Sequence, residues 1–226
     1  SYIKFGLPVE FGKNHLVDFI VFGGDSTADG ANSTAQKEIM LKCYKTARGT
    51  NVQSYILRGN HDTHFTGYGI NDLISQKQWF ELACKHLTDV HFDPDNPKGG
   101  YWYSDFEECK IRIIFMNRAD VEDETGETIV NPTTVYVLQR QTDWLCNMAL
   151  NFIDKGEDRE NWATLIVSHC DFRNHFVESI LEAYMNGDDL STTVPVTDDV
   201  TVTIEVDFTD QGPMEFIGTI SGHSHY

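Results

Sequence analysis

The sequence predicts a layered α/β fold in a single domain spanning residues 1–226. Short apolar runs that end in glycine or polar residues alternate with helical segments, and further strands follow near the C-terminus. No internal repeat, low-complexity tract or linker-like stretch divides the chain. This order is typical of sheets covered by helices. A hydrophobic content of 40% and a charged content of 23% exclude disordered, collagen-like and coiled-coil chains.

The first half of the chain is predicted to run strand, helix, strand, helix. Residues 17–23 form an apolar run that leads into a glycine turn, as expected for a buried strand. A helix is expected over about 33–48, where apolar residues recur at helical spacing after the capping residue Ser33. The next strand is expected over 52–57 and the next helix over 74–86.

The second half is predicted to contain paired strands, a long polar loop, a helix, a strand, another helix and two final strands. These elements are expected at residues 101–106, 110–117, 118–134, 139–153, 163–167, 173–185, 200–208 and 214–220. We interpret the polar loop as an insertion of the kind in which substrate selectivity often resides.

The charge balance limits the partners of the protein. There are 35 acidic residues against 17 basic residues, a net charge of −18, so general nucleic-acid binding is not expected. The abundant carboxylates leave cation binding open. No apolar run is long enough to span a membrane. Five scattered cysteines without a CxxC motif predict reduced thiols and a cytoplasmic location.

Four predicted strands end in residues that can bind a metal ion. These are Asp25, the Asn60-His61-Asp62 group, His169, and the pair His223 and His225. Loops at the carboxyl ends of strands converge in layered α/β proteins, so these side chains can meet in space. The mixed nitrogen and oxygen set suits Mn, Fe, Zn or Ni better than Ca. A carboxylate can also bridge two cations about 3.5–4 Å apart.

Each of these features has an ordinary structural explanation when taken alone. A Gly-Asp pair and an Asn-His-Asp group are both common in turns, and a lone His169 can be a hydrogen-bonded polar residue. His223 and His225 lie two residues apart, so on an extended segment they face the same side. The occurrence of all four features in order, each at a strand end, favours a metal site. His175, on a predicted helix, is expected to be a surface residue.

The motifs GGD at residues 23–25, GNHD at 59–62, SH at 168–169 and GHSH at 222–225 resemble those of the calcineurin-like metallophosphoesterases. The segments YWYSDFEECKIRIIFMN and QTDWL are also similar to the middle strands and the following helix of that family. The resemblance extends from about residue 17 to 226 and implies a four-layered αββα sandwich.

The resemblance also implies how two divalent metal ions are held. Asp25 would bridge both metals. Asn60, His169 and His223 would complete the shell of the second metal, and His225 would reach the first metal.

The implied reaction is hydrolysis of a small phosphomonoester or phosphodiester. A hydroxide held between the metals would attack phosphorus in line. His61 would act as the general acid at the leaving-group oxygen, oriented by Asp62.

One motif of the family is missing from residues 1–24: the Asp-x-His that supplies two ligands to the first metal. Only Asp25 and His225 then remain for that metal, whereas the second metal keeps four ligands. We therefore expect a chain cut inside the fold at both ends, which binds one metal well. The alternative is a metal-binding domain of a larger protein that is catalytically impaired or inactive. A nuclease of the same superfamily is a third hypothesis, which the acidic charge opposes.

Overall fold

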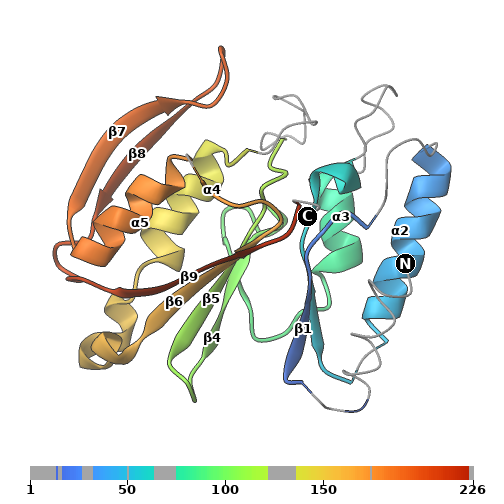
Figure 1. Cartoon of the computed structure of the whole chain (residues 1–226), viewed down its shortest axis with the longest axis horizontal. Helices are drawn as coiled ribbons and strands as arrows, with labels where there is room; N and C mark the ends of the chain where they lie inside the picture. Colours follow the sequence, from blue (N-terminus) through green and yellow to red (C-terminus); the bar gives the residue numbers. More distant parts are fainter. Residues whose placement is uncertain are drawn as a thin grey trace.

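The computed structural model describes residue 14 and residues 17–26, 33–49, 51–63, 75–121, 136–173 and 175–223. Two sheets lie between layers of helices (Figure 1). The smaller sheet pairs β1 (Phe19–Phe22) with β2 (Gln53–Ile56) in parallel. The larger sheet has the strand order β3-β4-β5-β6-β9. Its strands are β3 (His91–Phe92), β4 (Trp102–Phe106), β5 (Ile111–Met116), β6 (Ala163–Ser168) and β9 (Glu215–Ser221).

Helices cover the outer faces of both sheets. Helices α2 (Ser33–Ala47) and α3 (Gln76–Ala83) lie beside the β1–β2 sheet, and α4 (Gln139–Trp144) and α5 (Val177–Asn186) cover the larger sheet (Figure 1). Helix α3 begins with a capping box, in which the hydroxyl of Ser75 accepts from the Gln78 amide at 3.1 Å.

The side chains of β5 divide the interior into two cores. Ile113 and Phe115 face the smaller sheet, where the Phe115 ring stacks on Tyr55 at 4.4 Å. Ile114 and Met116 face α4 and α5 on the other side. Because both faces of β5 are buried, its sequence is almost continuously apolar. This arrangement confirms the predicted αββα sandwich.

Strand direction brings the four motifs to one edge of the molecule. Strands β5, β6 and β9 are parallel, and Met116, Ser168 and Ser221 are aligned across them at their carboxyl ends. Strands β1 and β2 are also parallel, and Phe22 pairs with Ile56 where both end.

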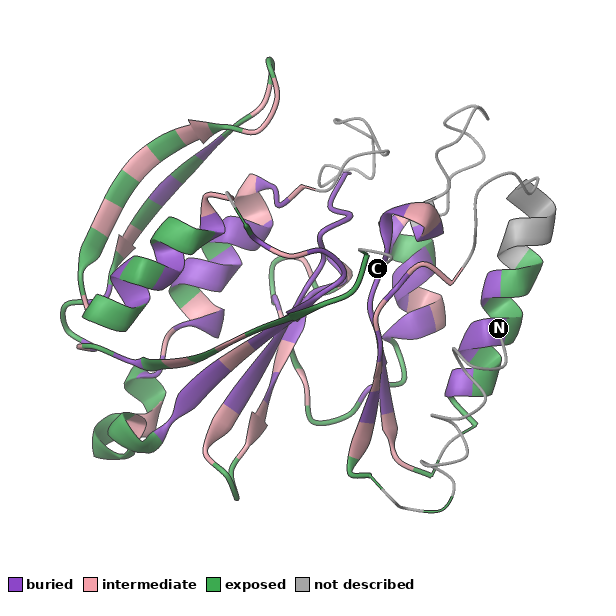
Figure 2. Ribbon diagram, viewed as in Figure 1, coloured by how far each residue is buried: buried purple, intermediate pink, exposed green. Residues whose placement is uncertain are grey.

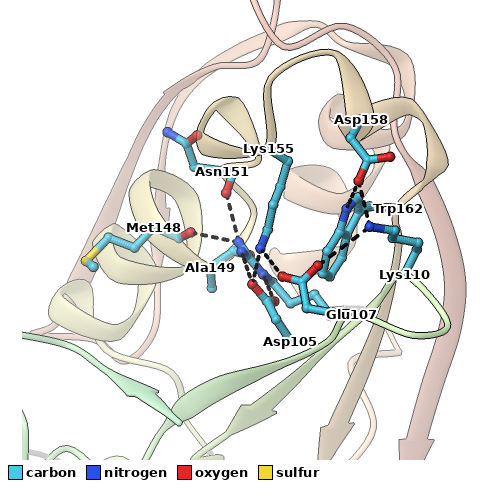
Figure 3. A network of polar contacts seen from close by, with 10 residues as sticks. Asp105, Glu107, Lys110, Met148, Ala149, Asn151, Lys155, Asp158 and Trp162 are labelled. Atoms are coloured by element: carbon cyan, nitrogen blue, oxygen red, sulfur yellow. Dashed lines mark hydrogen bonds and ion pairs between the residues drawn. The ribbon is translucent and has the colours of Figure 1, made fainter. Parts of the chain in front are cut away.

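The opposite end of the β4–β5 hairpin is held by an ion-pair network (Figure 3). The fully buried Arg112 binds Asp105 through two nitrogens at 2.6 and 2.9 Å. Its Nη1 also donates to the carbonyl oxygens of Ala149 and Asn151 at 3.2 and 2.8 Å. Lys155 lies 2.9 Å from Asp105. Burial alone would raise the pKa of Asp105, but these two cations lower it.

Several predicted boundaries were wrong. The helix expected over 139–153 is α4 followed by a π-helical turn, η4 (Leu145–Ala149), and a 3₁₀ segment, η5 (Ile153–Asn161), comes after it. The carbonyl groups at the end of this helical stretch bond to Arg112 instead of continuing the helix. The helix expected over 173–185 begins only at Val177, because the amide of His175 bonds to the carbonyl of Phe172 in a tighter turn just before it.

Strands β3 and β7 (Asp189–Pro195) were not predicted. β7 pairs with β8 (Thr201–Asp207) in a separate two-stranded hairpin that lies beside α4 and α5 (Figure 1). Its residues alternate between exposed and half-buried, so it lacks the apolar run of a core strand (Figure 2). Most of the loop expected over 118–134 lies outside the described residues.

All five cysteines are free thiols, of which only Cys109 is exposed. In the described part of the chain, no helix combines the length and the apolar character needed to cross a bilayer.

Candidate active site

The loop that carries Gly24 after β1 and the loop that carries Gly59 after β2 approach each other closely. Gly24 has a φ of 87°, which favours glycine. A Cβ atom at Gly24 would lie 2.7 Å from the amide nitrogen of Gly59 and 2.8 Å from Nδ1 of His169. Asp25 follows with a φ of 52°, a strained conformation for a residue with a side chain. Glycine at position 24 therefore permits the contact that places Asp25 beside the second loop.

Asp62 connects these two loops. Its Oδ1 accepts a hydrogen bond from the amide of Ser26 at 2.7 Å, and its Oδ2 accepts one from the amide of Gly59 at 2.9 Å. Burial raises the pKa of the Asp62 carboxyl, although both amide bonds oppose this shift. Both of its oxygens thus bind backbone amides, and the expected orientation of His61 by Asp62 stays a prediction. Asp62 fixes the loops that carry the site.

Three neighbouring side chains surround Nε2 of His169. Nε2 of His169 lies 3.2 Å from Oδ1 of Asn60, 3.1 Å from Nδ1 of His223 and 3.2 Å from Oδ2 of Asp25. Nδ1 of His169 lies 2.6 Å from the carbonyl oxygen of Gly23. A carbonyl only accepts, so Nδ1 carries a hydrogen. Nε2 can then donate at most one hydrogen bond, yet it faces three atoms that have lone pairs.

The separations from Nε2 are those of neighbouring ligands around a divalent cation. Nitrogen and oxygen ligands lie about 2.0–2.2 Å from Zn²⁺, which places neighbouring ligands of a tetrahedral or octahedral ion about 2.8–3.6 Å apart. The three separations from Nε2 fall within this range. His223 is exposed, so the point of convergence can be reached from solvent. We call these residues the four-donor site: Asp25, Asn60, His169 and His223.

An ion pair holds the site together when no cation is bound. Burial alone would raise the pKa of Asp25, but its hydrogen bond to His169, together with the charge of that ring, lowers it. Burial alone would lower the pKa of His169, but Asp25 and the carbonyl of Gly23 raise it above its ordinary value of 6.5. Each partner thus stabilises the charged form of the other.

His61 lies next to this site on the short 3₁₀ helix η2 (Asn60–Thr63). Its amide donates to Oδ1 of Asp25 at 3.1 Å, and the residue is half-buried. The backbone of His61 is thus fixed by the same carboxylate that faces His169. The remaining predicted ligand, His225, lies outside the described residues.

The positions of two further side chains, Cys170 and His175, were not foreseen. Sγ of Cys170 lies within 4.8 Å of the ligand nitrogens of His169 and His223. Its place directly after His169 is the signal that sequence analysis overlooked. His175 was expected at the surface, but it is half-buried and its ring packs on Phe176 at a centroid distance of 4.2 Å.

Comparison with known proteins gives one family. Residues 7–226 match the family described as calcineurin-like phosphoesterase, so the match covers nearly the whole chain. No curated protein and no solved structure shows significant similarity to the chain. The αββα layers and the four-donor site agree with the family match. The chain therefore belongs to the calcineurin-like phosphoesterases, which are metal-dependent hydrolases of phosphoesters.

Proposed function

We propose that the four-donor site binds a divalent cation and that the protein uses it to hydrolyse a small phosphomonoester or phosphodiester. The observation that supports this proposal most strongly is the convergence of three lone-pair atoms on Nε2 of His169, at 3.1–3.2 Å. The second nitrogen of His169 is held by the carbonyl of Gly23, an arrangement typical of histidines that ligate metals.

The donor set suggests which metal is bound. Nitrogen and oxygen donors without a thiolate suit Mn, Fe, Zn or Ni. When bound, such a cation lowers the pKa of a coordinated water and neutralises charge on the phosphoryl oxygens.

Asp25 is suited to bridge two cations, because Oδ2 faces His169 whereas Oδ1 is directed toward the His61 amide. We propose that His225 reaches the first of two cations and that Asp25 is shared between them.

We assign His61 as the general acid that protonates the leaving-group oxygen. Its main chain is held by Asp25, and the loop that carries it is held by Asp62. Rigid placement matters because a proton donor must lie within hydrogen-bond reach of its acceptor. The half-buried position of His61 beside the site is consistent with this role.

The test is Mn²⁺-dependent hydrolysis of bis(p-nitrophenyl) phosphate and p-nitrophenyl phosphate by the whole chain. His169→Ala should abolish both turnover and the thermal stabilisation by Mn²⁺. His61→Ala should lower kcat by about 10²–10⁴-fold while Mn²⁺ stabilisation is kept. His86→Ala, at an exposed histidine outside the site, serves as the control and should retain wild-type activity. Equal turnover in wild type and His169→Ala would exclude catalysis at this site.

A metal-binding domain without turnover is the second candidate. The absence of an Asp-x-His motif from residues 1–24 favours it, because the first metal would then be poorly held. Mn²⁺ stabilisation that depends on His169, without hydrolysis of either ester, would support this candidate over the enzyme.

A further inference from the structure

A circuit of buried hydrogen bonds starts at Arg58, two residues before Asn60 of the four-donor site. The side chain of Arg58 is only 1% exposed. Its Nη1 donates to Oε1 of Gln76 and to the carbonyl oxygen of Ala119, both at 3.3 Å. Gln76 is the first residue of α3, and Ala119 follows β5. Arg58 therefore connects the loop after β2 to a helix and to the larger sheet.

The circuit closes at the carbonyl group of Gly99. That oxygen accepts from Nε2 of Gln76 at 2.7 Å and from Nδ2 of Asn117 at 3.0 Å. Oδ1 of Asn117 in turn accepts from the amide of Ala119 at 3.0 Å. We call these residues the Arg58 ring: Arg58, Gln76, Gly99, Asn117 and Ala119. All of them are buried, and a buried polar network whose members bond one another favours a single arrangement.

The Arg58 ring is fixed to the strands that lead to His169. Asn117 directly follows β5, and its amide and carbonyl groups each bond to the side chain of Gln141 in α4 at 2.8 Å. Strand β5 pairs in parallel with β6, where Met116 is aligned with Ser168. Since His169 is the next residue after Ser168, the ring has a defined position relative to that ligand.

The main chain on either side of Arg58 is also fixed. The preceding amide, of Leu57, donates to the carbonyl of Phe22 at 2.9 Å. The following amide, of Gly59, donates to Oδ2 of Asp62 at 2.9 Å. A displacement of Arg58 is therefore passed on to the proposed ligand two residues later.

We infer that Arg58 is a positioning residue that sets the distance between Asn60 on the smaller sheet and His169 on the larger one. The inference rests on the proposed function. Oδ1 of Asn60 lies 3.2 Å from Nε2 of His169. A cation requires its ligands at fixed separations, and a functional site must be held to within about 0.5 Å. The Arg58 ring supplies this precision from the far side of Asn60 in the sequence, and Arg58 itself need not contact the cation.

The test compares Mn²⁺ affinity with stability, by calorimetric titration of the metal-free chain and by thermal unfolding in EDTA. Arg58→Met should weaken Mn²⁺ binding by about tenfold or more, the loss expected when the support of a metal ligand is removed. Arg112→Met is the matched control, because Arg112 is equally buried but belongs to the network at the opposite end of the sheet. It should lower the Tm yet leave Mn²⁺ affinity within about twofold of wild type.

A variant at Gln76 tests the ring itself, because Gln76 is distant in sequence from every proposed ligand. Gln76→Met should weaken Mn²⁺ binding by about threefold or more, and the exposed neighbour variant Lys77→Met should leave it unchanged. The double variant Arg58→Met/Gln76→Met should bind Mn²⁺ about as weakly as Arg58→Met alone, since the ring is already open. Losses that add in the double variant would overturn the ring as the route.

A purely structural role predicts a different result. A lower Tm of Arg58→Met in EDTA, combined with Mn²⁺ affinity within about twofold of wild type, would overturn the inference. If Arg58→Met does not fold, Arg58→Lys and Gln76→Met decide. Weaker Mn²⁺ binding by both supports the inference, and unchanged binding by both overturns it.

The wild-type protein separates this inference from the proposed function. If wild type binds no Mn²⁺, both fail. If wild type binds Mn²⁺ and Arg58→Met binds it equally well, only the role of Arg58 fails. If wild type binds Mn²⁺ without hydrolysing an ester and Arg58→Met binds it more weakly, the positioning role holds and the proposed catalysis fails.

Discussion

Nδ1 of His169 donates a 2.6 Å hydrogen bond to the carbonyl oxygen of Gly23, which connects a side chain at the end of β6 to the backbone at the end of β1. This bond fixes the ring orientation and directs Nε2 toward Asp25, Asn60 and His223. A cation bound at the proposed site would compete with protons for Nε2, so its binding would depend on the protonation of His169.

Stabilisation by Mn²⁺ should therefore increase with pH. In the metal-free protein the His169–Asp25 pair stabilises the fold above the ordinary Asp pKa of 3.8 and below the ordinary His pKa of 6.5. This contribution is lost as the pH rises through the raised pKa of His169. A bound cation needs the unprotonated ring. The difference in Tm between Mn²⁺ and EDTA samples should thus grow from about pH 6 to about pH 8.

Thermal unfolding across this pH range measures the effect, with His169→Ala as the control that should show no Mn²⁺-dependent shift. A difference in Tm that stays constant or shrinks as the pH rises would contradict proton–metal competition at His169.

Asp62→Asn should destabilise the protein by about 1–3 kcal/mol. The amide side chain keeps one acceptor oxygen, so it can satisfy either Ser26 or Gly59 but not both. Urea unfolding measures the loss. Asp198→Asn, at an exposed residue, should change the free energy of unfolding by less than about 0.5 kcal/mol. A variant at position 62 as stable as wild type would mean that the two amide bonds contribute little.

Gly24→Ala should disrupt both the fold and the metal site. The added Cβ would lie within 3 Å of Gly59 and His169, and the φ of 87° is strained for alanine. Gly156→Ala is a matched control, because its φ is 58° and nothing lies within 4 Å of the added atom.

We expect about 1 kcal/mol of destabilisation at position 156, from backbone strain alone, and more than about 2 kcal/mol at position 24. Mn²⁺ stabilisation should disappear only in the position-24 variant. If Gly24→Ala retained the full Mn²⁺ effect, the close approach of the loops would not be needed for the site.

Arg112→Met should cost about 3 kcal/mol or more, because it leaves the carboxylate of Asp105 with only Lys155 as a partner. Lys110→Met, which removes an exposed ion pair with Asp158, should cost less than about 1 kcal/mol. Chemical denaturation compares the two variants. Neither should change Mn²⁺ affinity, since this network lies at the end of the sheet opposite the site. A similar loss in both variants would show that burial of the Arg112 pair is unimportant.

Sequence alone predicted the elements whose signals are local. β1, β2, β5 and β6 are apolar runs that end in glycine or polar residues, and all four were placed within two residues at each end. β7 was missed because its side chains alternate only between exposed and half-buried. The start of α5 was misplaced because its N-cap, Phe176, offers no capping side chain.

The same difference between residues with a local sequence signal and residues without one applies to the site. Asp25, Asn60, His169 and His223 could be named because each follows a strand whose end reaches the same edge of the molecule. The role of Asp62 could not be read from the sequence, because its partners are backbone amides of Ser26 and Gly59.

The four donors come from both halves of the sandwich. Asp25 and Asn60 follow strands of the smaller sheet, whereas His169 and His223 follow strands of the larger one. The proposed cation, held by all four, would therefore be a reversible cross-link between the sheets. It couples the unfolding of one sheet to that of the other, so chelation should speed amide hydrogen exchange in both and expose the space between them to proteases. Metal supply would thus regulate the lifetime of the folded protein as well as its chemistry.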